Sequence, residues 1–542
     1  MRKRVQGAVV LVAVVAVGLG TGTASASSGR GPTARADWYP AVAGRALTIP
    51  AAIGVVADDK VSAGGARTVV GNTTPAHGTL QLQADGSFRY VPAAGFHGTD
   101  TFSYTMTDAV RLYPTKLPAL ATVDGTTLTG GAYGSAVAPV PGHPDEYYGL
   151  TDRGPNVDGP DGSKVEPVPS FTPSIGLFRM SSGLTGTEAK LVRTIPLRAG
   201  DGTPYNGQVN PQASTNEVIY DDNGNVLPAS ADGYDSEGLV ALADGTFWVS
   251  DEYGPFMTHF SRTGTAIERL SPYDGSLPRE LANRVPNKGM EGLTVTPDGK
   301  TLVGIMQQAL NQPDVKTTKT GSYPVVRIVT VDLATRATHE YVYLLDDPQT
   351  TNTGISEITA LSATRFAVDE RDGNVEPSSY KKLWTIDVSK ATDVGPVTTA
   401  GPYDVSKGGL TVGGASLEKL VGKNTTAGAT AVLAAAGITP VAKSLDLDLG
   451  GLVTQLNPAG YFFGHDKVEG VATTDGGRTL LISNDSDFGI DAVAKETAPF
   501  GVHVKTLPNG QQDDGEYLAV DTTRLTNGVA ATSTATVTIR VR

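Results

Sequence analysis

The sequence predicts an all-β protein in which a β-propeller is inserted into a small β-sandwich. Three observations lead to this prediction. They are a repeated pair of short apolar strands joined by a turn, an N-terminal segment that alternates apolar and polar residues, and a strand at the far C-terminus that matches this segment. The composition agrees, because 65 glycines, 34 prolines and 39% hydrophobic residues are typical of turn-rich β-structure rather than of a disordered chain.

The N-terminus has the three regions of a secretory signal peptide. Arg2–Arg4 is a positively charged start, Ala8–Leu19 is an unbroken run of small and aliphatic residues, and Ala24–Ala26 fits the small-x-small cleavage pattern. The apolar run is shorter than the roughly 20 residues that a membrane-spanning helix needs. We therefore expect residues 1–26 to be a signal peptide, the mature protein to be secreted, and no membrane span to remain after cleavage.

Charge and cysteine content narrow the function classes. The formal net charge of −13 disfavours nucleic acid and anionic membrane surfaces as partners, and it suits a protein that gathers cations. The 542 residues contain no cysteine, so no disulfide can form even though the protein is expected to be exported. Stability must therefore come from buried apolar surface, which a chain of this length can supply.

The segment of residues 37–109 shows the pattern of a small sandwich. His77–Leu82 alternates apolar and polar residues, and an Asp-Gly turn leads to a second strand at Phe88–Pro92. A third strand is predicted at Asp100–Asp108. With its "HGTL", "DGSFRYVP" and "GFHGTDTFSYTMTD" stretches, the segment resembles the bacterial cadherin-like and immunoglobulin-like modules of secreted and surface proteins.

In those modules a last strand follows shortly, whereas here the matching strand, Ala535–Val541, stands at the end of the chain. We therefore predict that residues 37–109 and 531–542 together form the sandwich, and that the propeller, residues 110–530, is inserted into its last loop. The alternative is that the C-terminal strand closes the propeller or does not pack at all.

A repeat fills the segment between these two parts. Each copy has an acidic residue and a glycine, an apolar strand, an Asp-Gly turn, a second apolar strand, and a polar or acidic pair. The copies begin at Gly134, in degenerate form, and at Ser236, Met290, Ser356 and Val468. Five copies predict five blades, each completed by the strands that follow the repeat.

Two spans between the copies are long enough to leave six blades as the alternative. Gly200–Ala231 is rich in Gly, Asn and Asp and is interpreted as a loop. The span between Glu357 and Glu469 includes the alanine-rich segment Ala427–Val441, which is expected to hold a helix or two.

The repeated acidic positions are expected to meet at one mouth of the propeller channel. The start of the first strand and the end of the second belong to the same end of an antiparallel pair. The predicted metal ligands are Asp152, Glu237, Asp251, Glu252, Glu291, Glu357, Asp369, Glu370, Glu469, Asp485 and Asp487. Oxygen-only ligands favour Ca²⁺, with Mg²⁺ as the alternative, and the absence of cysteine argues against zinc.

Basic residues beside these acids predict an anionic substrate. The candidate catalytic residues are Glu237, Glu370, Arg153, Arg371, Lys288 and Lys467. The basic side chains and the cation would hold a phosphate or a carboxylate of the substrate, and either glutamate would act as base on water. Ser135 and Gln307 replace the expected acids in two blades, so the site is expected to be asymmetric.

Five motifs in order identify a family resemblance: "GSAVAPVPG…YYGLTDRGPN", "DSEGLVALADGTFWVSDEYGP", "KGMEGLTVTPDGKTL", "SEITALSATRFAVDERDG" and "KVEGVATTDGGRTLLISNDSDFG". Together they resemble the phytase-like family, also described as "esterase-like activity of phytase". The resemblance implies a propeller that hydrolyses phosphoric esters, with a small phosphorylated substrate and the recurrent Glu and Asp residues as functional groups. It covers about residues 112–525.

Other functions remain open at this point, because fold does not fix function. The acids can bond blade to blade with no chemical role. The protein can be a non-catalytic binding or adhesion protein whose sandwich contacts a cell surface or a polysaccharide. It can also be a lactonase-like hydrolase, since metal-centred propellers of that type use a cation at the channel mouth.

Overall fold

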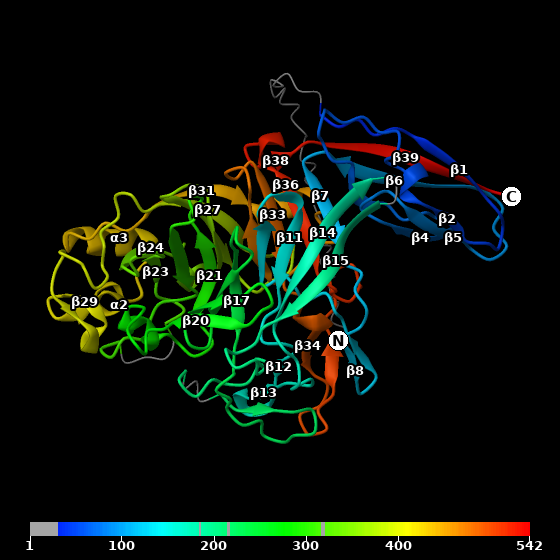
Figure 1. The fold of residues 1–542 in the computed structure, drawn as a ribbon. Helices are drawn as coiled ribbons and strands as arrows, with labels where there is room; N and C mark the ends of the chain where they lie inside the picture. Colours follow the sequence, from blue (N-terminus) through cyan, green and yellow to red (C-terminus); the bar gives the residue numbers. More distant parts are fainter. Residues whose placement is uncertain (1–30, 184–185, 214–216, 316–319) are drawn as a thin grey trace, which may run out of the picture.

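The computed structural model describes residues 31–183, 186–213, 217–315 and 320–542 of the chain. The predicted signal peptide, residues 1–26, lies outside the described residues. Among the described residues, no helix is both long and apolar enough to cross a membrane. Most of the regular structure consists of short β-strands, as Figure 1 shows.

Five of the six four-stranded sheets in the described residues form the larger part of the molecule (Figure 1). In each sheet the strands pair antiparallel, from an inner strand to an outer one. Blade 1 contains β10 (Ala136–Val140), β11 (His143–Leu150), β14 (Ser174–Gly183) and β15 (Gly186–Pro196). Blade 2 contains β17 (Ser236–Ala241), β18 (Phe247–Asp251), β19 (Phe256–Phe260) and β20 (Ala266–Leu270).

The other three sheets follow the same plan. Blade 3 contains β21 (Met290–Val295), β22 (Thr301–Met306), β23 (Val325–Asp332) and β24 (Thr338–Leu344). Blade 4 contains β25 (Gly354–Ala360), β26 (Arg365–Arg371), β27 (Lys381–Asp387) and β31 (Ala442–Asp448). Blade 5 contains β32 (Val468–Ala472), β33 (Thr479–Asn484), β36 (Glu516–Asp521) and β7 (Val110–Pro114).

The inner strands form a closed ring. β10 contacts β17, β17 contacts β21, β21 contacts β25, β25 contacts β32, and β32 contacts β10. The outer strand of blade 5 is β7, which comes from the start of the propeller sequence. The first strand therefore closes the last blade, and both ends of the propeller leave the ring at the same place.

The sandwich is assembled from both ends of the chain, as predicted. One sheet has the order β1 (Asp37–Ala41), β39 (Thr532–Val541), β6 (Gly98–Thr107) and β3 (Thr68–Asn72). The other has the order β2 (Leu47–Ile49), β5 (Phe88–Pro92) and β4 (Gly78–Leu82). The C-terminal β39 pairs antiparallel with β6 and parallel with β1, so the propeller is inserted between β6 and the last strand of the sandwich.

Polar contacts hold the sandwich against blade 5. The Arg524 guanidinium donates to Asp108 Oδ2 at 3.0 Å, to the Ala63 carbonyl at 2.7 Å and to Asp521 Oδ2 at 2.8 Å. The Asn457 side chain, just after a short helix, donates to the Val70 carbonyl at 2.7 Å. The contacts to Asp108, Ala63 and Val70 join residues far apart in sequence and connect the sandwich to the propeller.

The span between β27 and β31 forms a small lobe. It contains β28 (Tyr403–Asp404), β29 (Gly409–Val412), β30 (Ala415–Ser416), α2 (Leu417–Val421) and α3 (Thr426–Ala435). α3 confirms the helix predicted in the alanine-rich segment. The lobe packs against the outer part of blade 3, where Leu433 joins Val325 and Val342 in one apolar cluster. Its three-stranded sheet is separate from the blades.

The remaining elements are short and lie in the connections. Two further helices are α1 (Pro348–Thr351) and α4 (Leu449–Leu456). The short strands are β8 (Ala121–Val123), β9 (Thr126–Leu128), β12 (Val157–Asp158), β13 (Lys164–Val165), β16 (Ile219–Tyr220), β34 (Ile490–Val493), β35 (Val502–Val504), β37 (Leu525–Thr526) and β38 (Val529–Ala530). Single 3₁₀ turns occur at Ala51–Ile53, Pro160–Gly162, Arg279–Asn283, Val405–Lys407, Asp487–Gly489 and Thr522–Arg524.

A β-bulge explains the repeated Glu-Gly pair. In β17 the register with β18 shifts between Ser236 and Leu239, so Glu237 and Gly238 form the bulge. The same shift occurs in β21 and β32, around their Glu-Gly pairs. A Cβ on Gly238 would lie 2.6 Å from the Glu291 carbonyl oxygen of the next blade. The glycine therefore lets neighbouring inner strands approach closely, and the bulge redirects the glutamate beside it.

Candidate functional site: the acidic mouth of the channel

A cavity of about 240 Å³ lies at the channel mouth where the inner strands begin. Two sets of structurally equivalent positions surround it. The first, here the strand-start ring, comes from the starts of the inner strands, at a β-bulge in blades 2 to 5: Ser135, Glu237, Glu291, Ser356 and Glu469. The second, the strand-end ring, follows the second strand of each blade: Asp152, Glu252, Gln307, Arg371 and Asp485. All of these except Ser135 line the cavity.

Blade 4 corrects the sequence alignment by one residue. Its bulge lies between Ile355 and Glu357, so Ser356 takes the place that Glu237 has in blade 2, and Glu357 takes the place of the glycine. The pairing of the second strand shifts in the same sense, which puts Arg371 at the position of Glu252. Blade 4 therefore presents a serine and an arginine to the cavity instead of two acids.

Three carboxylates on blade 2 lie close enough to share an ion. Asp235, Glu237 and Glu252 each offer an oxygen, and these oxygens lie within 4.8 Å of one another. The Asn287 side-chain amide is 3.2 Å from Asp235 Oδ2 and 3.1 Å from Glu252 Oε2. With its NH₂ group turned inwards it donates to both carboxylates, and with its oxygen turned inwards it adds a fourth oxygen donor. Glu252 Oε1 makes no hydrogen bond to the described residues.

The pKa values of these carboxyl groups indicate that the cluster would be stabilised by an added positive charge. Burial, followed by repulsion from Glu291 and Asp235, raises the pKa of Glu237 well above its usual range. Burial raises the pKa of Glu252 to about 8, although the nearby Lys288 opposes the shift. Burial and then Glu252 raise the pKa of Glu291 as well. A divalent cation would remove this repulsion and keep the carboxylates ionised.

Three basic side chains line the same cavity: Lys288, Arg371 and Lys467. Arg371 forms an ion pair with Glu469 of the next blade and donates to Ser356 Oγ at 2.9 Å. Lys288 is the least constrained, because its Nζ lies 3.9 Å from Glu252 Oε1 and the side chain is about one third exposed. The cavity thus has a cluster of acids on blade 2, and on its other sides basic side chains stand among further acids.

Lys467 belongs to a buried network of charges on blade 5. Its Nζ contacts Asp485 Oδ2 at 3.2 Å and also pairs with Asp487. The second oxygen of Asp487 accepts from Lys505 Nζ at 2.7 Å. Despite burial, the two lysines hold the pKa of Asp487 below its usual range. Asp487 is therefore neutralised by lysines, which corrects the expectation that it coordinates a metal.

Several predicted site residues lie away from the cavity. Arg153 is buried behind Asp235: its Nε is 3.8 Å from Asp235 Oδ2, and its Nη1 donates to Tyr253 Oη at 2.5 Å and to Glu217 Oε2 at 3.1 Å. Asp251 accepts from the backbone N–H groups of Asp235 and Tyr253 at 3.2 and 2.8 Å. Both residues support the chain around Asp235 and do not reach the cavity.

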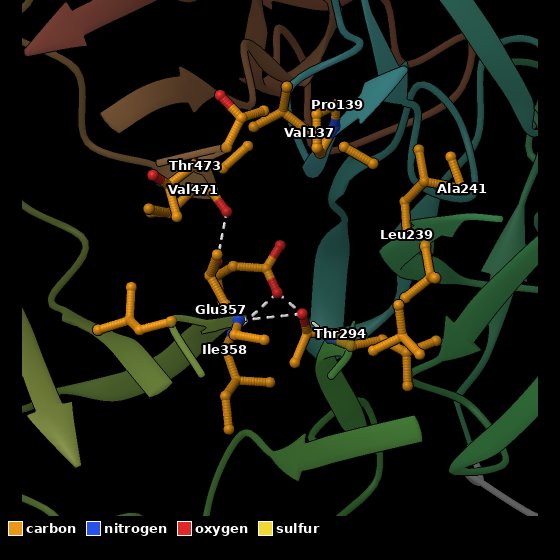
Figure 2. Close-up of a pocket in the computed structure, with 18 of the residues that line it drawn as sticks. Val137, Pro139, Leu239, Ala241, Thr294, Glu357, Ile358, Val471 and Thr473 are labelled. Atoms are coloured by element: carbon orange, nitrogen blue, oxygen red, sulfur yellow. Dashed lines mark hydrogen bonds between the residues drawn. The ribbon is translucent and has the colours of Figure 1, made fainter. Parts of the chain in front are cut away.

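Three more predicted site residues, all on blade 4, lie away from the acidic mouth. Glu370 accepts hydrogen bonds from Tyr343 Oη at 2.9 Å and Lys443 Nζ at 2.7 Å, so it joins the outer strands of blades 3 and 4 and leaves no face for a water molecule. Asp369 is buried without a hydrogen bond, and burial raises its pKa to about 8. Glu357 points towards the other mouth of the channel (Figure 2).

Sequence analysis missed Asp235 and Asn287. Asp235 stands two residues before Glu237. At the equivalent position the other blades have Tyr133, Gly289, Gly354 and Lys467. The sequence signal for Asp235 was therefore an acid that occurs in only one copy of the repeat. Asn287 lies in the connection before β21 and has no repeat position. Asp372, which also lines the cavity, follows Arg371 directly.

Comparisons with known proteins agree on two modules. A family model described as "Phytase-like: Esterase-like activity of phytase" matches residues 127–488, which is more than half of the chain. A model of the bacterial cadherin-like domain matches residues 30–117. The two matches correspond to most of the propeller and to the N-terminal part of the sandwich.

Individual relatives are more distant. A protein of Arthroderma benhamiae described as an uncharacterized secreted protein is 30% identical over 285 residues, which are 42% of this chain and 54% of that protein. The chain thus spans about half the length of this curated relative.

Among solved structures, Kuenenia stuttgartiensis hydrazine synthase is 14% identical over 67% of this chain and 77% of its own, with a TM-score of 0.28. The Dos1 propeller is 7% identical over 78% and 88%, with a TM-score of 0.26. Structural similarity at this level carries no argument, and the assignment depends on the family match: the chain belongs to the phytase-like family, with a bacterial cadherin-like module at its N-terminus.

Proposed function

We propose that this protein is a secreted hydrolase of phosphoric esters that works with a divalent cation at the acidic mouth of its propeller. The observation that carries the proposal is one cavity lined by Glu237, Glu252, Lys288 and Arg371, in which the two glutamates lie close enough to Asp235 for the three carboxylates to share a cation. Membership of the phytase-like family supports phosphoric esters as the substrate class.

The donor set fits a hard cation. Asp235, Glu237 and Glu252 supply carboxylate oxygens, Asn287 can supply an amide oxygen, and Glu252 Oε1 has no hydrogen-bond partner among the described residues. Such oxygen-only sets favour Ca²⁺, with Mg²⁺ as the alternative. When bound, the cation would act as a Lewis acid towards a phosphoryl oxygen.

The basic side chains would bind the phosphate of the substrate. Lys288 has the freedom to reach it, since its contact with Glu252 is 3.9 Å long. Arg371 is held in place by Glu469 and Ser356, so its planar guanidinium can meet two phosphate oxygens without losing much conformational freedom.

Glu291 is our candidate for proton transfer. It lines the cavity from blade 3, outside the group of three carboxylates that would hold the cation. Burial and Glu252 raise its pKa, which suits a carboxyl group that takes up and returns a proton during a reaction. This role replaces the one predicted for Glu370, which the structure places between blades 3 and 4.

Two further parts of the proposal concern location. The predicted signal peptide and the printed description of the fungal relative as secreted both support export. The cadherin-like sandwich would provide contact with a cell surface or a polysaccharide. In this arrangement the sandwich fixes the enzyme near its substrate, and the propeller carries the chemistry.

The test is a hydrolysis assay on the purified chain. Phosphate monoesters, phosphate diesters, phytate and a simple lactone are each incubated with Ca²⁺, with Mg²⁺ and with a chelator. We expect phosphoester turnover that needs the cation and is lost in the Glu237→Gln, Glu252→Gln double variant. Turnover that survives the chelator, or turnover of the lactone alone, would contradict the proposal.

A further inference from the structure

The channel opens at its other end into a second cavity of about 400 Å³ (Figure 2). It is built from the same inner strands, two or three residues beyond the strand-start ring. Each blade contributes an apolar side chain to its wall: Val137, Leu239, Leu293, Ile358 and Val471. None of the residues that line it is basic. Nothing in the proposed hydrolase chemistry uses this space.

One buried carboxylate faces the second cavity. Glu357 is only 2% exposed, and its Oε1 accepts hydrogen bonds from the backbone N–H groups of Leu293 at 3.2 Å and Ile358 at 2.8 Å. The described residues give Oε2 neither a hydrogen bond nor an ion pair. In Figure 2 the carboxylate projects into the space enclosed by the apolar side chains.

Two hydroxyl groups of the cavity wall take part in hydrogen bonds between neighbouring blades. Thr359 Oγ1 donates to the Val471 carbonyl, which ties blade 4 to blade 5. Thr294 Oγ1 accepts from the Ala360 N–H at 3.1 Å, which ties blade 3 to blade 4. Among the residues that line this cavity, Glu357 is therefore the charged one.

This arrangement selects a particular ligand chemistry. A buried carboxylate without a counter-charge is costly in apolar surroundings, and burial raises the pKa of Glu357 accordingly. A bare metal ion would need several oxygen ligands, whereas the cavity offers one free carboxylate oxygen and a wall of hydrocarbon. A cation that carries its own apolar surface satisfies both the carboxylate and the wall.

We propose that the second cavity binds a small organic ammonium, such as a primary arylalkyl- or alkylammonium. Its NH₃⁺ group would donate to Glu357 Oε2, and its hydrocarbon part would pack against the apolar side chains of the five inner strands. The site is independent of the hydrolase proposal, because it uses the opposite mouth of the channel and none of the residues of the acidic cavity.

Calorimetric titration of the full chain tests this site with two probes of equal shape, phenethylammonium and 2-phenylethanol. We expect the wild-type protein to bind the ammonium about tenfold more tightly or better, because a charge-assisted hydrogen bond contributes about 1.5–3 kcal/mol. In Glu357→Gln this preference should vanish, while binding of the alcohol persists. The glutamine oxygen can still accept from the Leu293 N–H, so the variant keeps its local backbone contact.

Two controls decide where the probe binds. Ala241→Trp places a large side chain in the second cavity and should abolish binding of both probes, and this variant decides the question if Glu357→Gln does not fold. Glu237→Gln changes the acidic mouth and should leave the affinity for phenethylammonium unchanged. The proposal is overturned if the wild type does not prefer the ammonium, if Ala241→Trp binds it normally, or if Glu237→Gln removes its binding.

Discussion

The two mouths of the propeller channel differ sharply although the same five strands build them. At one mouth Glu237, Glu291 and Glu469 line a cavity with seven carboxylates and three basic side chains. At the other mouth Leu239, Leu293 and other apolar side chains surround Glu357. The inner strands of blades 2, 3 and 5 therefore change from charged to apolar along their own length.

The change takes two residues. Glu237 and Leu239 both line the channel, as do Glu291 and Leu293, with a β-bulge at each glutamate. Two residues of strand correspond to about 7 Å, so charge and hydrocarbon meet within the thickness of one side chain. The glycine between them carries no side chain and lets the blades close around this boundary.

The largest expected effect comes from the acidic mouth. In Glu237→Gln we expect phosphoester hydrolysis to fall about 100-fold or more, since charge stabilisation at a reacting group is usually worth that much. The measurement is kcat/KM with saturating Ca²⁺. The matched control is Asp244→Asn, the same change on the same blade but in the exposed turn at the opposite end. An equal loss in both variants would show that the acidic mouth has no special role.

The boundary between the mouths is the next target. In Gly238→Ala the new Cβ would lie 2.6 Å from the Glu291 carbonyl oxygen and from the Leu293 N, so blades 2 and 3 must separate. We expect a loss of about 2 kcal/mol or more in the free energy of unfolding, measured in denaturant. Gly183→Ala, where a Cβ meets nothing within 4 Å, should change stability little. Similar stabilities for the two variants would contradict the close approach of the blades.

The sequence could predict the strands on both sides of this boundary, but not which residues face each mouth in every blade. Strand pairs joined by Asp-Gly turns, the Glu-Gly positions and the returning C-terminal strand are local patterns, so the propeller and the split sandwich were predictable. The bulge in blade 4 is not local: one residue of shift exchanges Ser356 and Glu357 between the two mouths and brings Arg371 to the acidic cavity. Glu370 and Asp487 were misplaced because their lysine partners, Lys443 and Lys505, come from distant strands or loops.

The basic side of the acidic mouth should have a smaller effect. In Lys288→Gln we expect KM for the phosphoester to rise about tenfold with kcat little changed, because a lysine that contacts the phosphate before and during reaction contributes uniform binding. Steady-state kinetics measure both constants. Lys300→Gln is the control, an exposed lysine in the turn at the opposite end of blade 3. A fall in kcat with unchanged KM would instead assign Lys288 to the reaction step.

The smallest expected effect is a pH dependence that separates the two mouths. Burial raises the pKa of Glu252 to about 8, and it also raises the pKa of Glu357. Between the ordinary glutamate pKa and these values the folded chain binds more protons than the unfolded chain, so stability must fall as pH rises. In chelator we expect the thermal midpoint to fall by several degrees from pH 5 to 8. Ca²⁺ should reduce the part of this fall in the thermal midpoint that is due to Glu252. The Glu357→Gln variant should lose a different part of the fall, on which Ca²⁺ has no effect. A midpoint that rises with pH in chelator would contradict the burial of uncompensated carboxylates at both mouths.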